Sequence, residues 1–223
     1  MPASSFQGPL GQRLVIAGAT GALGNEVMRL LVGLQTFRDV QVLAREPITA
    51  GLRGVGTHVV DERPPQEWPV LPADAAVVMF EPARLFYERE RALWTPQAQD
   101  LLPLAKWLRA SGVATLAIVM PHTQMRLPES LKRGLADMDE HAVAALGFQR
   151  LLIVRSAQKA PAPGRAGVLE NLARFMLSVG KYMVPSSEQP VRAVKVAQFV
   201  AHALQLAPPG IHVASSETLW QAA

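Results

Sequence analysis

The sequence lacks cysteine altogether, in a chain of 223 residues. This absence excludes disulfide bonds, catalysis by a thiol and zinc sites with cysteine ligands. It agrees with a reducing compartment, and we predict a cytoplasmic location. Tyrosine is nearly as rare, since Tyr87 and Tyr182 are the only two. A reaction that needs tyrosine as its acid therefore has only two candidates.

The sequence also lacks a long apolar run. No stretch approaches the roughly 20 residues that a membrane-spanning helix needs, so we expect no membrane partner. Residues 1–12 contain neither a charged n-region nor an apolar h-region. They are predicted to be a disordered lead-in rather than a secretory signal.

No part of the chain has a cluster of charged residues of the same sign. There are 22 Lys and Arg against 18 Asp and Glu, for a formal net charge of +4, but the basic residues are scattered. We therefore expect a mixed, solvated surface and no nucleic-acid partner. The five histidines show no metal-ligand spacing, so no metal site is predicted.

What the sequence does contain is a regular alternation of apolar runs and amphipathic segments. The apolar runs predict strands at residues 14–16, 40–44, 57–60, 75–80, 113–120, 150–154 and 211–214. Helical spacing predicts helices from about residue 23 and at 84–94, 96–110, 128–146, 169–179 and 191–206. The inward residues are predicted to be Leu101, Leu104, Ala105 and Leu108 in the third helix, Met138, Ala142 and Ala145 in the fourth, and Val194, Ala197, Val200, Ala201 and Leu204 in the last. Such alternation is typical of βαβ units and a parallel sheet covered on both faces.

The stretch LVIAGATGALG, residues 14–24, joins the first strand to the first helix. Gly18, Gly21 and Gly24 follow one another at a spacing of three. The N-terminus of a helix offers unpaired N–H groups and a partial positive charge, which suit a pyrophosphate. A Cβ at Gly18 or Gly21 would obstruct the turn or the ligand, and Gly24 lets the helix pack closely on its strand. The motif predicts dinucleotide binding, with a plain strand–helix turn as the alternative.

This glycine loop selects the Rossmann version of the α/β class. We predict a doubly wound parallel sheet in the order 3-2-1-4-5-6, with a seventh strand at the edge. Residues 13–223 are expected to form a single domain, in which residues 157–190 provide most of a small C-terminal lobe on the substrate side. A ligand would lie across the carboxyl ends of the strands, at the switch point.

The loop GATGALG closely resembles the cofactor loop of the atypical and extended short-chain dehydrogenases/reductases, which include the NmrA-like proteins and the nucleotide-sugar epimerases. A weaker pattern of resemblance covers about residues 13–220, including Arg155 after the sixth strand. The resemblance implies a nicotinamide dinucleotide as the cofactor. It places as candidate cofactor ligands Gly18, Thr20, Gly21, Ala22, Leu23, Gly24 and, at the end of the fourth strand, Phe80.

Arg45 directly follows the second strand, at the place where NAD-selective Rossmann folds carry an acidic residue. A guanidinium there pairs with the 2′-phosphate, so NADP is predicted as the cofactor and NAD is less favoured. Glu46 leaves an alternative open, because a shift of one residue would put a carboxylate near the same ribose. By the resemblance, Asp61 matches an aspartate near the adenine; an ordinary strand-end cap is its alternative.

The catalytic pair of active family members is missing from the predicted helix after the fifth strand. Those members carry Tyr-x-x-x-Lys there, and the tyrosine moves a proton while the nicotinamide moves a hydride. An alignment on Glu140 and on Gly147-Phe148 places Lys132 at the tyrosine position and Ala136 at the lysine position. Neither role is filled.

Three residues are candidate substitutes for the missing pair. His122 follows the fifth strand, and its unperturbed pKa of about 6.5 suits proton transfer, although a loop histidine with a structural hydrogen bond is the alternative. Tyr87 follows the fourth strand, and Lys132 offers a cation for a phosphate. Two hypotheses remain open. One is a cofactor-binding or redox-sensing module that signals to a protein partner; the other is an NADPH-dependent oxidoreductase or epimerase-like enzyme for a small carbonyl or nucleotide-linked substrate.

Overall fold

The computed structural model of the chain describes residues 12–34, 36–48, 54–83, 88–120, 140–155, 192–215 and 218–219. Residues 1–11 of the predicted lead-in, the helix at 169–179, the lobe at 157–190 and residues 128–139 of the helix predicted at 128–146, with Met138, lie outside the described residues. The lead-in is wrong at its last residue, because Gln12 begins the strand Gln12–Ala17. Within these ranges no helix combines the length and the apolar character that crossing a membrane requires. The same ranges contain no group of three or more histidine, aspartate or glutamate side chains arranged to hold a metal ion.

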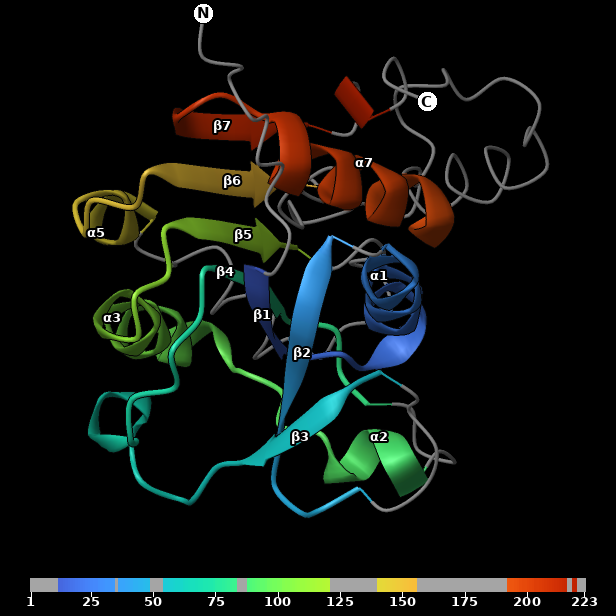
Figure 1. Cartoon of the computed structure of the whole chain (residues 1–223), viewed down its shortest axis with the longest axis vertical. Helices are drawn as coiled ribbons and strands as arrows, with labels where there is room; N and C mark the ends of the chain where they lie inside the picture. The colour runs from blue at the N-terminus through green and yellow to red at the C-terminus, as the bar shows by residue number, and fades with distance from the viewer. Residues whose placement is uncertain are drawn as a thin grey trace, which may run out of the picture.

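The described strands form one parallel sheet at the centre of the molecule (Figure 1). Its order is β3-β2-β1-β4-β5-β6-β7, and every neighbouring pair is parallel. The predicted order with a seventh strand at the edge is therefore confirmed. The bounds of the strands are β1 Gln12–Ala17, β2 Phe37–Ala44, β3 Gly56–Val59, β4 Ala75–Met79, β5 Thr115–Val119, β6 Arg150–Val154 and β7 Gly210–Ala214.

Helices cover both faces of this sheet. On one face α1 (Gly21–Gly33) packs against α7 (Ala193–Leu206), and on the other lie α3 (Leu101–Ala110) and α5 (Glu140–Ala144), as Figure 1 shows. The molecule thus has three layers, helix–sheet–helix, which is the doubly wound arrangement predicted from the sequence.

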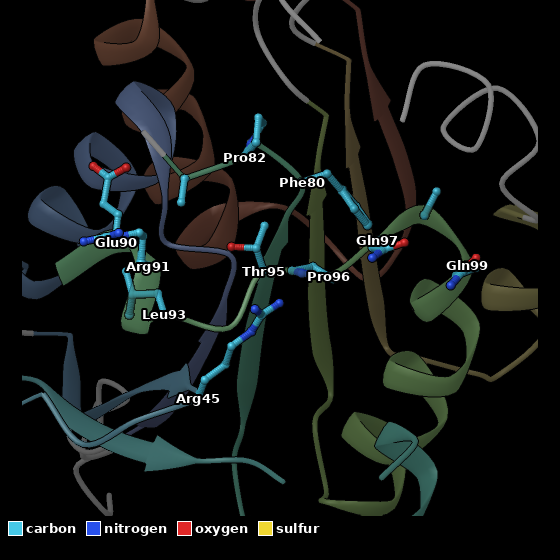
Figure 2. A pocket seen from close by; sticks show the side chains of 12 residues that line it. Arg45, Phe80, Pro82, Glu90, Arg91, Leu93, Thr95, Pro96, Gln97 and Gln99 are labelled. Carbon is cyan, nitrogen blue, oxygen red and sulfur yellow. The ribbon is translucent and has the colours of Figure 1, made fainter. Parts of the chain in front are cut away.

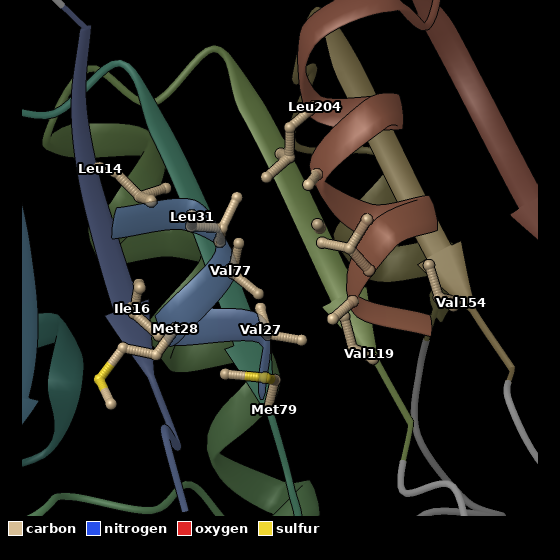
Figure 3. Packing of buried hydrophobic residues seen from close by; sticks show 14 of the residues in the cluster. Leu14, Ile16, Val27, Met28, Leu31, Val77, Met79, Val119, Val154 and Leu204 are labelled. Atoms are coloured by element: carbon tan, nitrogen blue, oxygen red, sulfur yellow. The ribbon is translucent and has the colours of Figure 1, made fainter. Parts of the chain in front are cut away.

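The apolar run of β1 is continuous because the strand is buried on both faces. Leu14 and Ile16 pack into the cluster formed with α1 and α7, whereas Val15 and Ala17 pack into the cluster formed with α3. All four are 2% exposed or less. Figure 3 shows the first cluster, with Leu31 of α1 lying over the strands.

The prediction of a helix at residues 84–94 is wrong at its C-terminal end. The described part, α2, ends at Ala92. Leu93 instead forms an isolated antiparallel bridge with Ala44 at the end of β2. The N–H of Trp94 donates to the carbonyl of Leu43 at 2.9 Å. The backbone here pairs with the sheet, a long-range contact that local helical spacing does not reveal.

The next helix begins later than the sequence predicts. Pro96 is not in its first turn; a short 3₁₀ turn at Ala98–Asp100 precedes α3. This turn opens on a capping box, in which the side chains of Gln97 and Asp100 each bond the other's backbone. The end of the helix at Ala110 is confirmed. The predicted inward stripe is also confirmed, since its members Leu101, Leu104, Ala105 and Leu108 are all buried.

Two residues predicted to face inward are exposed, and a third, Ala142, is only half-buried. Ala145 is exposed because α5 ends at Ala144, and Val143 is the buried residue of that helix. Val194 is 41% exposed, whereas Val196 is fully buried. Val194 lies in the first turn of α7, at the end of the apolar stripe, where less of the neighbouring structure covers it.

Gly24→Ala is expected to lower the free energy of unfolding by about 1–3 kcal/mol, because a Cβ there would lie 2.7 Å from the carbonyl carbon of Ala19. Gly33→Ala, in the same helix, is the matched control. No atom lies within 4 Å of its added Cβ, so helix propensity should leave stability unchanged or raise it by up to about 1 kcal/mol. Urea denaturation measures both variants, and equal stabilities would contradict the close packing at Gly24.

Candidate functional site

The turn between β1 and α1 lies at the switch point of the sheet, with β2 on one side of β1 and β4 on the other. Gly18 and Gly21 have φ angles of +75° and +70°, in the left-handed region that glycine adopts without strain. The helix begins at Gly21, inside the glycine motif, rather than near Leu23. The turn therefore places the first N–H groups of α1 directly at the carboxyl end of the sheet.

At Gly18 and Gly24 an added side chain would lie too close to backbone atoms. An added Cβ at Gly18 would lie 2.9 Å from the carbonyl carbon of Met79 and 3.1 Å from Cδ of Pro96. An added Cβ at Gly24 would lie 2.9 Å from the carbonyl oxygen of Gly18, besides its contact with Ala19. These distances agree with the predicted close approach of strand, turn and helix.

Two acidic side chains from much later in the chain contact the first turn of α1. The N–H of Leu23 donates to Oε2 of Glu81 at 2.8 Å, and the N–H of Gly21 donates to Oε2 of Glu90 at 3.1 Å. Carboxylates are stabilised at this place because the helix N-terminus carries N–H donors and a partial positive charge. Sequence reasoning missed both acids. Glu81 carried a usable signal, since it comes just after β4, at the sheet edge where ligands bind.

The other predicted loop residues differ in what they present. Thr20 is the N-cap residue of α1 and is fully buried; its hydroxyl donates to the carbonyl of Glu81 and lies 3.3 Å from Oγ1 of Thr95. Ala22 is exposed. Leu23 is buried in the core, so only its backbone N–H faces the site.

A pocket of about 620 Å³ opens beside the turn (Figure 2). Arg45 reaches into it from the end of β2, and Phe80 lines it from the end of β4 although that side chain is 1% exposed. Arg91, Thr95 and Gln97 line it as well. Sequence reasoning missed these three, because no motif marks them and only the fold brings them beside Arg45.

Residues 92–96 cross the ends of β1 and β2 and form one wall of the pocket. The N–H of Arg45 donates to a carbonyl of this segment at 2.7 Å, and the N–H of Gly18 donates to the carbonyl of Trp94 at 3.1 Å. The ring of Trp94 packs edge-on against the buried Trp68, with ring centroids 5.1 Å apart. Sheet and core therefore hold this segment in place.

Asp61 lies near the end of β3 and does not line the pocket. Its carboxylate accepts the N–H of Arg63 at 3.0 Å and Nε of Arg63 at 2.8 Å. The hydrogen-bonded Arg63 guanidinium lowers the pKa of the Asp61 carboxyl. This geometry matches the strand-end cap that the sequence left open, and a role for Asp61 near the adenine stays a prediction.

No protein-family model matches the sequence, and no curated protein matches it. Solved structures do. Triphenylmethane reductase of Citrobacter sp., crystallised with NADP(H), superposes with a TM-score of 0.56 at 15% identity, covering 90% of this chain and 68% of that one. A short-chain dehydrogenase/reductase of Veillonella parvula in complex with NADP superposes with a TM-score of 0.52 at 14% identity, covering 88% of each chain.

A nucleoside-diphosphate-sugar epimerase of Staphylococcus aureus superposes with a TM-score of 0.52 at 15% identity, covering 91% of this chain and 70% of that one. The chain has the Rossmann fold that these solved structures share. This confirms, at the level of the fold, the resemblance that the sequence motif indicated. In this fold the glycine turn joins β1 to α1 between the two neighbours of β1, β2 and β4.

The candidate catalytic residues of the Rossmann domain, His122, Tyr87 and Lys132, lie outside the described residues, so their roles stay predictions. One detail of the alignment that placed Lys132 has a structural counterpart. Glu140, on which the helix was aligned, pairs with Arg155 after β6, with 2.5 Å between Oε2 and Nη2. Two residues that carry the resemblance thus contact each other.

Proposed function

We propose that this chain binds NADP(H) across the carboxyl ends of β1, β2 and β4. The observation that carries the proposal is the glycine turn, with Gly18 and Gly21 both at left-handed φ, beside a pocket that contains Arg45. Two of the superposed structures were crystallised with NADP(H) or NADP, which supports the same cofactor for this chain.

The residues at the site match the parts of this dinucleotide. The first turn of α1 supplies N–H groups suited to the pyrophosphate, and Arg45 supplies a guanidinium suited to the 2′-phosphate. The pocket volume of about 620 Å³ falls within the range typical of cofactor and ligand sites. Phe80 adds an apolar wall. When bound, the nicotinamide would supply a hydride donor or acceptor.

In this proposal the protein is a cofactor-binding or redox-sensing module, and a protein partner recognises its cofactor-bound state. The reason lies in the sequence, which has Lys132 and Ala136 where active members of the superfamily have tyrosine and lysine. Hydride transfer to a carbonyl needs an accompanying proton. Without the tyrosine–lysine pair the usual source of that proton is missing.

The alternative is an NADPH-dependent oxidoreductase or epimerase-like enzyme that acts on a small carbonyl or nucleotide-linked substrate. One observation favours it: Gln97 and Gln99 also line the pocket and offer polar groups for a substrate. His122 or Tyr87 would then serve as a displaced acid.

Purified protein is expected to bind NADPH in a calorimetric titration and to show no turnover with simple aldehydes, ketones or quinones. Loss of NADPH absorbance over time measures the turnover. If a substrate is reduced, and His122→Ala or Tyr87→Phe stops the reaction, that residue is the displaced acid and the enzyme hypothesis holds. Robust turnover that survives both substitutions would contradict this account of the site.

A further inference from the structure

The space beside Gly21, which the glycine motif keeps free of a side chain, is filled by a carboxylate of the same chain. A Cβ added at Gly21 would lie 2.7 Å from Oε2 of Glu81. The same oxygen accepts the N–H of Leu23 at 2.8 Å. Glu81 thus lies where a Rossmann loop admits the close approach of a phosphate group.

Glu90 places a second carboxylate at the same helix turn, but in a different setting. Its side chain is 1% exposed. Oε2 accepts the N–H of Gly21 at 3.1 Å, and Oε1 accepts Nδ2 of Asn25 at 2.8 Å. Glu81 is only half-buried, so it reaches solvent with less rearrangement. Of the two carboxylates, Glu81 is therefore the one that an incoming ligand displaces more readily.

The backbone around Glu81 is held by contacts that do not involve its carboxylate. The carbonyl of Glu81 accepts the hydroxyl of the buried Thr20. On the other side of the turn, the carbonyl of Trp94 accepts the N–H of Gly18. A rotation of the Glu81 side chain leaves both of these bonds intact. Movement of the carboxylate away from the turn therefore does not require either of these two contacts to break.

We propose that Glu81 is an autoinhibitory residue, whose carboxylate occupies the pyrophosphate subsite and must leave the first turn of α1 before NADP(H) binds. The inference rests on the proposed function, because it concerns the regulation of the same site. Its physical cause is competition, because the Glu81 carboxylate and a pyrophosphate need the same N–H donor, that of Leu23. Their like charges also repel at short range, and more strongly because Glu90 keeps a further carboxylate nearby.

When Glu81 occupies the subsite, NADP(H) cannot bind there. The apparent affinity for NADP(H) is therefore the affinity of the open form multiplied by the fraction of molecules that are open. In the wild-type protein, the hydrogen bond between the N–H of Leu23 and the Glu81 carboxylate must break before NADPH binds. Glu81→Ala removes this bond. The expected result is NADPH binding that is about tenfold to a hundredfold tighter than in the wild type. Glu81→Gln keeps an acceptor for the N–H of Leu23 but not the charge, and is expected to lie between the two.

The matched control is Glu67→Ala. Glu67 carries the same charge, but it is exposed and lies in the short 3₁₀ turn Pro65–Glu67, outside the pocket lining. Calorimetric titration with NADPH measures the affinity of each variant. Energy transfer from tryptophan to bound NADPH is a second measure, since Trp94 adjoins the glycine turn. Circular dichroism and the melting temperature establish that each variant is folded.

Tighter binding by Glu81→Ala, with Glu67→Ala within about twofold of the wild type, supports the proposal. Binding by Glu81→Ala where the wild type shows none supports it also. If the wild type binds NADPH and Glu81→Ala binds it equally or more weakly, Glu81 only caps the helix and the inference is overturned while the proposed function stands. If neither binds millimolar NADPH, the proposed function fails and the inference fails with it. Should Glu81→Ala not fold, Glu81→Gln decides between the same outcomes.

Discussion

Gly21→Val is expected to abolish NADPH binding while the protein stays folded. The residue has a φ of +70°, and a side chain there would enter the space at the first turn of α1 in which Oε2 of Glu81 now lies. A phosphate needs the same space, so we expect a loss of affinity of more than about a hundredfold. Left-handed backbone costs a residue with a side chain about 1–2 kcal/mol, which is less than the usual stability of a domain.

The matched control for this substitution is Gly147→Val. Gly147 has a φ of +71° and no atom within 4 Å of an added Cβ, so it carries the same backbone strain without crowding the site. Calorimetry with NADPH measures binding, and thermal unfolding measures stability. We expect both variants to lose similar stability and only Gly21→Val to lose binding. Unchanged affinity in Gly21→Val would overturn the assignment of the loop.

Arg45→Ala is expected to remove most of a preference for NADPH over NADH, and to leave the affinity for NADH almost unchanged. The guanidinium lies in the pocket at the end of β2, where the adenosine ribose of a Rossmann cofactor lies. A charge-assisted bond to the 2′-phosphate contributes about 1.5–3 kcal/mol. The wild-type preference should therefore be about tenfold to a hundredfold.

Two further variants make this test specific. Arg38→Ala removes the same charge from an exposed position near the start of β2, at the opposite end of the strand, and should leave the preference intact. Glu46→Ala tests the alternative that the neighbouring carboxylate meets the ribose. Paired titrations with NADPH and NADH measure all of these proteins. Equal affinities in the wild type, or a preference for NADH, would make Glu46 the better candidate.

The layers of this protein were predictable from the alternation of strand and helix patterns, and the strand order from the glycine loop that selects the Rossmann version of the fold. Buried parallel strands such as β1 read as continuous apolar runs, and helices such as α3 keep their apolar residues on one face. Both patterns are local, so they can be recognised without knowing how the rest of the chain folds. Gly18 and Gly21 were predictable for the same reason, because a tight strand–helix turn needs left-handed backbone. Arg45 was predictable from its place directly after a strand.

The presence of the Glu81 and Glu90 carboxylates at the first turn of α1 could not be predicted in this way. Leu23 and Glu81 are 58 residues apart in the chain, and Gly21 and Glu90 are 69 apart. No local period links such residues. The bridge of Leu93 to Ala44 likewise replaced a predicted helical turn with contact to the sheet. Sequence patterns report which way a side chain faces within its own element. Which side chain fills a turn depends on where distant elements end, and folding of the whole sheet sets that position.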